Sequence, residues 1–187
     1  MKRLSRVCFP VFPEDGVLRL HGPGPRPRAG VAPRLPGALL VHDSDHLELS
    51  TLQGRVEVTV TLEEWDGAPV PGDPGADEGH WEEAAATTVF LRGYVGVGCD
   101  VSGRALGAWL SGGSRRYHAD IRARRRHAVA ERYDRLLRLY RDPQCAEFRL
   151  AEDGLRGQEE FLVRLWPAVE APSSVEHGVR YPTAVSG

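Results

Sequence analysis

Four side chains that could hold a metal ion lie close together in the segment VHDSDHLEL, residues 41–49. They are His42, Asp43, Asp45 and His46. Imidazole and carboxylate groups are common ligands of zinc and similar ions, and a metal-bound water can attack a substrate in hydrolysis. The Asp-Ser-Asp run is also typical of a turn between two strands, because Asp side chains bond to nearby backbone groups. We favour the turn and keep a metal-dependent hydrolase as an alternative function.

A glycine-rich segment, GYVGVGCDVSG at 93–103, resembles a dinucleotide-binding motif only in part. Gly96 and Gly98 are spaced like the first two glycines of that motif. Gly103, however, lies too far along the chain to be the third glycine, and no helical pattern follows. Cys99 and Asp100 could join a catalytic site, but no particular histidine is implicated. The sequence therefore predicts a protein that is not an enzyme and needs no cofactor.

Ten arginines occur in residues 115–141 of a chain whose net charge is only −2. The outward positions predicted from the residue pattern are Arg122 and Arg124 on a strand, and Arg132, Arg135 and Arg138 on one face of a helix. Few aromatic residues accompany these arginines at outward positions, so the platform that stacks nucleic-acid bases is missing. Nucleic acid is therefore an unfavoured partner, and a nucleic-acid-binding module is a further alternative function.

The segment between Trp65 and Trp81 is acidic and rich in glycine and proline. Such a loop can dock into a basic cleft of another protein, since its carboxylates imitate phosphates and its tryptophans supply anchor area. We predict a protein-binding surface that includes this loop and the five arginines above. The predicted contact residues of the loop region are Glu63, Glu64, Trp65, Asp66, Asp73, Asp77, Glu78 and Trp81.

Alternation of apolar and polar residues is the main structural signal from residue 37 onwards. In RVEVTVTLEEW, for example, Val56, Val58, Val60 and Leu62 fall on one side of a strand. The spacing changes to three and four residues only at 127–141, which predicts an amphipathic helix there. A strand is expected again in AEFRL and in EEFLVRLWPAV. The fold class predicted is mainly β, an antiparallel β-sandwich with one inserted helix at about 127–141.

The chain divides into three expected parts. Residues 1–36 give a short N-terminal strand, VLRL at 17–20, and a proline-rich connector, residues 37–168 give the β-sandwich domain, and residues 169–187 give a mobile tail. Three cysteines without metal-ligand spacing predict reduced thiols. The absence of a signal peptide and of a long apolar run predicts a cytoplasmic protein without a membrane partner. The oligomeric state stays open.

Two short motifs carry a family resemblance. They are the Tyr/Arg strand with Tyr117, Arg122 and Arg124, and the ending EEFLVRLWPA at 159–168. With them, the chain resembles a group of uncharacterised β-sandwich proteins of high-GC bacteria, which is distantly similar to competence protein J, an inhibitor of a partner nuclease. The resemblance covers roughly residues 37–168, and the helix at 127–141 is an insertion relative to it. It implies a protein-binding inhibitor or immunity protein whose partner is a nuclease or toxin, with no catalytic residues.

Overall fold

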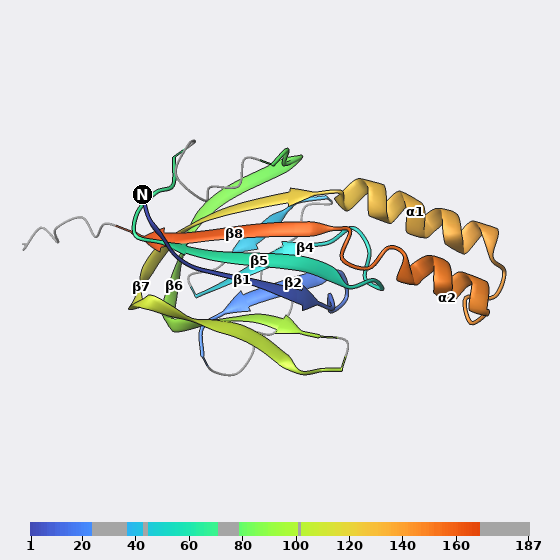
Figure 1. The fold of residues 1–187 in the computed structure, drawn as a ribbon, viewed down its shortest axis with the longest axis horizontal. Coiled ribbons are helices and arrows are strands. Elements are labelled where there is room, and N and C mark those ends of the chain that lie inside the picture. Colours follow the sequence, from blue (N-terminus) through green and yellow to red (C-terminus); the bar gives the residue numbers. More distant parts are fainter. Residues whose placement is uncertain (24–36, 43–44, 71–78, 101, 169–187) are drawn as a thin grey trace, which may run out of the picture.

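The protein folds around one large β-sheet (Figure 1). The structure is a computed structural model and describes residues 1–23, 37–42, 45–70, 79–100 and 102–168. In chain order the elements are β1 (Arg3–Val11), β2 (Val17–His21), β3 (Leu40–His42), β4 (His46–Ser50), β5 (Val58–Trp65), β6 (Glu83–Cys99), β7 (Ala105–Arg124), α1 (Arg126–Leu139), α2 (Ala146–Asp153) and β8 (Glu160–Pro167). The sheet order is β1-β5-β8-β7-β6-β2-β4-β3. The predicted mainly-β class is confirmed.

The strand pairing is mixed. Strands β5 and β8 run parallel, with Val60 opposite Phe161, whereas the other neighbouring pairs are antiparallel. The prediction of a purely antiparallel sheet is therefore wrong for this pair. Parallel strands need a long crossover, and the chain between β5 and β8 supplies one that contains β6, β7 and both helices. Alternation within a strand does not reveal the direction of its neighbour.

The two longest strands, β6 and β7, carry the sheet around a bend. At the bend the pairing shifts from Arg92 opposite Ser114 to Tyr94 opposite Trp109. Gly93 and Gly113 lie there with φ angles of 74° and 71°, which glycine adopts without the steric penalty of a side chain. On one side of the bend β7 pairs with β8, and on the other β6 pairs with β2. A two-sheet sandwich is not confirmed, because β6 and β7 run through both halves of a single sheet.

The core lies on the inner face of this folded sheet. The predicted inward positions of β5 and β7 are confirmed, since Val58, Val60 and Leu62 are at most 2% exposed and the alternate residues 117–123 at most 1%. Strands β1 and β2 contribute Phe9 and Leu18 to the same core. Burial of such a side chain stabilises a fold by roughly 1.5–3 kcal/mol. Residues assigned to a separate N-terminal part thus lie within the main sheet, while the connector at 24–36 and the tail fall outside the described residues.

Helices α1 and α2 form a hairpin that projects from one end of the sheet (Figure 1). Helix α1 confirms the helix predicted at 127–141. The strand predicted in AEFRL is wrong: these residues begin α2, where the Cys145 side chain accepts a hydrogen bond from the Phe148 backbone N–H. Phe148 packs against Tyr133 and Tyr140, with ring centroids 6.2 and 6.0 Å apart. Neither helix has the length and apolar character needed to cross a membrane, as far as the chain is described.

Candidate protein-binding surfaces

Glu63 lies on the outer face of the sheet and is completely buried. Its cross-strand neighbours are Arg6 on β1 and Arg164 on β8, and Arg164 in turn faces Asp120 on β7. The Glu63 carboxylate lies 3.0 Å from Nη1 of Arg3 and 3.3 Å from Nε of Arg164. Positive and negative side chains therefore alternate across four strands. This arrangement compensates charges that would be costly to bury alone.

Trp65 is also buried in β5, and its indole N–H donates to the Glu63 carboxylate at 3.0 Å. The prediction that Glu63 and Trp65 belong to an exposed contact loop is therefore wrong. Strand β5 continues to Trp65, and the arginines of β1 and β8 cover its last residues. In the sequence, a cluster of acidic residues has the pattern of a solvated loop. The arginines that pair with these acids lie on distant strands and cannot be recognised from the local sequence.

Glu64 lies on the inner face and supports the bend. Its carboxylate accepts hydrogen bonds from the backbone N–H groups of Ser111 and Gly112, at 2.8 and 2.7 Å. These two residues belong to the irregular stretch of β7 opposite Gly93. Glu64 is only 1% exposed, so its predicted place on an exposed contact surface is wrong. Its carboxylate satisfies backbone donors that the strand pairing leaves free.

The remaining residues of the predicted acidic surface have different positions. Asp66 is exposed and accepts a hydrogen bond from the Lys2 backbone N–H at 2.8 Å. Trp81 is half-buried, with the Arg124 guanidinium 4.8 Å above its ring, a cation–π geometry. Asp73, Asp77 and Glu78 lie outside the described residues. The acidic loop as a contact surface stays a prediction for these last residues.

The five predicted arginines divide into two groups. Arg122 and Arg124 are half-buried on β7 and are paired with Asp120 at 3.0 Å and with Glu160 at 2.5 Å. On α1, Arg132 donates to the Gln158 side chain at 2.9 Å. Arg135 and Arg138 are exposed, without an ion pair to any described residue. Of these five arginines, those on the helix have no ion pair with a described residue, whereas the two on β7 are paired within the sheet.

The predicted metal ligands are only partly brought together. His46 Nδ1 lies 3.0 Å from an Asp45 carboxylate oxygen, whereas His42 is exposed at the end of β3 opposite Leu47. Asp43 lies outside the described residues. Within the described ranges, no group of three or more His, Cys, Asp or Glu side chains is placed to hold a metal ion. The four-ligand site stays a prediction.

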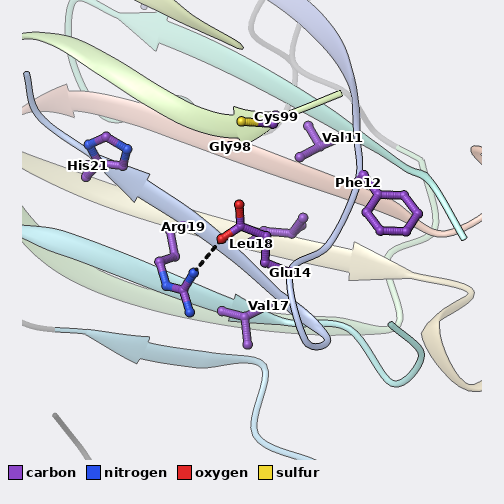
Figure 2. A pocket seen from close by; sticks show the side chains of 9 residues that line it. All are labelled: Val11, Phe12, Glu14, Val17, Leu18, Arg19, His21, Gly98 and Cys99. Carbon is purple, nitrogen blue, oxygen red and sulfur yellow. Dashed lines mark hydrogen bonds and ion pairs between the residues drawn. The ribbon is translucent and has the colours of Figure 1, made fainter. Parts of the chain in front are cut away.

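Gly98 and Cys99 line a small hollow beside the ends of β1 and β6, which Figure 2 shows. Its volume of about 10 Å³ is that of roughly one water molecule. Next to it, the Asp100 carboxylate accepts bonds from the backbone N–H groups of Ser102 and Arg104. The hydrogen bond from the Ser102 side chain is the main reason that the pKa of Asp100 is lowered. The glycine and cysteine motif thus forms a strand end and a turn.

A buried polar cluster lies where the helical hairpin joins the sheet. Arg126, the first residue of α1, is 0% exposed and forms an ion pair with Glu83 on β6. Glu159 is 0% exposed and accepts a hydrogen bond from Gln53 at 3.1 Å. Burial raises the pKa of Glu159 to about 7. Sequence analysis missed this cluster, because its members are far apart in the chain and their burial has no local signal.

The helical hairpin has an open groove of about 460 Å³ on one side. Tyr133, Leu137 and Phe148 line it, together with the charged residues Arg55, Arg149 and Glu152. Large apolar side chains are also exposed elsewhere on the hairpin: Leu139 is 68% and Leu150 is 77% exposed. The hairpin therefore combines apolar contact area with positively charged side chains.

A second group of exposed or half-buried side chains lies on the outer face at the bend of β6 and β7. We call it the aromatic–arginine band and define it as Phe90, Arg92, Tyr94, Trp109 and Arg116. Phe90 is directly opposite Arg116 and Tyr94 directly opposite Trp109. Trp109 is 77% exposed. Sequence analysis missed the outward aromatic residues, because the pairing shift at the bend cannot be read from alternation along one strand.

Neither a protein-family model nor a curated protein sequence matches the chain. The fold, however, matches the crystal structure of ComJ from Bacillus subtilis, which is described as an inhibitor of the DNA-degrading activity of NucA. The TM-score is 0.53 at 5% identity, and the match covers 89% of this chain and 98% of ComJ. The chain shares the fold of ComJ. A second match, crocagin biosynthetic gene J, has a TM-score of 0.43 at 13% identity and covers 89% and 99% of the two chains.

The similarity to ComJ agrees with the resemblance noted in the sequence at the level of the fold. It extends beyond residues 37–168, because a match over 89% of 187 residues needs more than that range. At 5% identity it does not assign ComJ's contacts to residues of this chain.

Proposed function

We propose that this chain is a non-enzymatic protein-binding protein that acts as an inhibitor or immunity protein, and that its partner is a nuclease or a toxin. Two things support the proposal. The fold is shared with ComJ, a nuclease inhibitor. In addition, the charged residues predicted from the sequence on β5 and β7 form ion pairs within the sheet. These groups therefore stabilise the fold and are poorly placed to act on a substrate.

The helical hairpin is the observation that carries this proposal. Its base is anchored by a small separate core of Val56, Val129 and Leu155, while its outer part exposes Leu139 and Leu150. Apolar side chains next to arginines are characteristic of protein–protein contact surfaces. Arg135 and Arg138 on α1 supply the charge beside the apolar surface.

The experiment is affinity capture of a partner from the lysate of the source cells. It compares the wild-type protein with a variant in which four exposed hairpin positions are changed together. This hairpin variant carries Leu139→Ser, Leu150→Ser, Arg135→Ser and Arg138→Ser. The control variant, Leu4→Ser with Val70→Ser, alters exposed apolar residues away from the hairpin, at 42% and 53% exposure. We expect the wild-type and control proteins to capture a nuclease or toxin and to inhibit it when it is purified.

The hairpin variant should retain its fold and bind the purified partner at least tenfold more weakly, since interface anchors contribute about 1.4 kcal/mol or more. If the hairpin variant bound the partner as tightly as the wild-type protein does, the hairpin would not be part of the interface. A wild-type protein that captures nothing and turns over a substrate would contradict the proposed function itself.

A further inference from the structure

We infer that the aromatic–arginine band is a docking face for an acidic surface of a partner protein, with Trp109 as its anchor. The inference rests on the proposed protein-binding function and adds a contact surface that the sequence did not indicate. The band lies at the bend of β6 and β7, and Figure 1 shows the helical hairpin at the other end of the sheet.

The aromatic part of the band is rigidly supported. The ring of Tyr94 packs edge-on against Trp109, with centroids 5.1 Å apart and planes at 64°. Tyr94 lies over Gly107, where an added Cβ would overlap its hydroxyl group. Trp109 therefore packs against a neighbouring ring that is itself seated on the backbone, while Trp109 remains 77% exposed. A large aromatic side chain fixed before binding loses little conformational freedom in a complex, which favours its use as an interface anchor.

The positive charge of the band is free for a partner. Arg92 and Arg116 are exposed, and neither has an ion pair or a side-chain hydrogen bond among the residues that the structure describes. No acidic residue occurs in the surrounding sequence at 84–99 or 102–119. By contrast, Arg122 and Arg124 further along β7 are both paired with carboxylates. The missing negative charges at the band are the ones that an acidic partner surface would supply.

The strand register places the residues of the band close to one another on the outer face. Leu91 and Val95 point into the core, so the alternate residues of β6 face outward. Residues that are directly opposite on antiparallel strands have side chains about 5 Å apart, which brings Arg116 next to Phe90 and Trp109 next to Tyr94. The arginines therefore border the aromatic rings.

A protein surface fits the band better than a single-stranded nucleic acid does. Base stacking needs ring faces that stand free in succession, but Trp109 and Tyr94 pack edge to face and Tyr94 covers Gly107. The whole chain carries a net charge of −2, which gives no general attraction to a polyanion. Trp, Tyr and Arg are the residues most enriched at the centres of protein interfaces.

The test compares four proteins in affinity capture followed by direct binding of the purified partner. They are wild type, Trp109→Ala, the double variant Arg92→Ser with Arg116→Ser, and the control Leu4→Ser with Val70→Ser. All changed positions are exposed, so thermal unfolding should confirm that each variant folds. The second measurement titrates wild type and Trp109→Ala into a dye-labelled twelve-nucleotide single-stranded DNA and follows binding by the fluorescence anisotropy of the dye.

We expect a captured protein that binds Trp109→Ala and the double arginine variant at least tenfold more weakly than the control. Its affinity for the wild type should fall as salt is raised, and this fall should be smaller for the double arginine variant. A partner that is captured equally by all four proteins would overturn the inference and leave the proposed function intact. Failure to capture any protein would overturn both, and DNA binding that depends on Trp109 would assign the band to nucleic acid instead.

Discussion

Two adjacent glutamates illustrate how far the role of a residue depends on the face it occupies. Glu63 points outward into a row of arginines, whereas Glu64 points inward and binds backbone N–H groups of β7. Both are buried, so each has an energetic role in the fold. The Glu64 contact is the more unusual of the two, because one carboxylate satisfies two donors at the point where the sheet bends.

We expect Glu64→Ala to lower the free energy of unfolding by about 2 kcal/mol, because it leaves two partly buried N–H groups without their acceptor. Glu64→Gln keeps one acceptor oxygen and should cost roughly half as much. Urea denaturation followed by circular dichroism measures both. Glu57→Ala is the control at a partly exposed position, and an equal loss in this control and in Glu64→Ala would contradict the assigned role.

Glu159 makes the stability of the protein depend on pH. Burial raises the pKa of Glu159 from its usual 4.5 to about 7, so between these values the folded protein holds a proton that the unfolded chain releases. Stability is therefore highest below pH 4.5, falls as the pH rises to 7 and is level above 7 as far as this group is concerned. The total loss corresponds to about 3 kcal/mol at most.

Glu159→Gln should remove this pH dependence, because the amide stays neutral and its oxygen can still accept the bond from Gln53. At pH 8 the variant should be the more stable protein, and at pH 4 the two should be similar. Thermal unfolding across this pH range measures the difference. Glu131→Gln, at an exposed position of α1, controls for the loss of one carboxylate. If Glu159→Gln kept the wild-type dependence of stability on pH, a different group would be responsible for it.

At the level of elements, the sequence predicts what local periodicity determines. The inward residues of β5 and β7 and the helix at α1 follow from spacing alone, since burial on one face imposes that spacing. Helix α2 was missed because it is short and buries only Phe148, so no repeat of three and four residues is visible. Strand β1 was missed because it contains Pro10, which edge strands tolerate and central strands do not.

The helical hairpin has a small core of its own. We therefore expect the hairpin to open without unfolding of the sheet. Val129→Ala removes two methyl groups from this core, which should cost about 2 kcal/mol. Amide hydrogens of α1 and α2 should then exchange up to about 30-fold faster, while those of β5 and β8 stay protected. Leu139→Ala, at an exposed site, is the control, and equal acceleration throughout the sheet would show that the hairpin and sheet unfold together.

At the level of the whole molecule, the sheet depends on pairings between distant segments. The first strand pairs with β5, and β5 pairs with β8 some hundred residues later. Such pairings are selected by the summed packing of all strands, so no single segment contains the information. Three residues of the predicted contact surface are misplaced for the same reason: Glu63, Glu64 and Trp65 look exposed in sequence, and partners from other strands bury them.

The membership of β1 in the main core gives the last prediction. Phe9 and Val11 are 8% and 0% exposed, and they lie opposite Val60 and Val58 of β5. Replacing both with Ala should cost about 5 kcal/mol, a large part of the total stability of a typical domain. Val7 and Cys8 lie on the same strand and are exposed, so Val7→Ala with Cys8→Ala should change stability by less than about 1 kcal/mol. If both pairs had the same small effect in urea denaturation, β1 would contribute little to the core, and β5 would be the effective edge strand of the sheet.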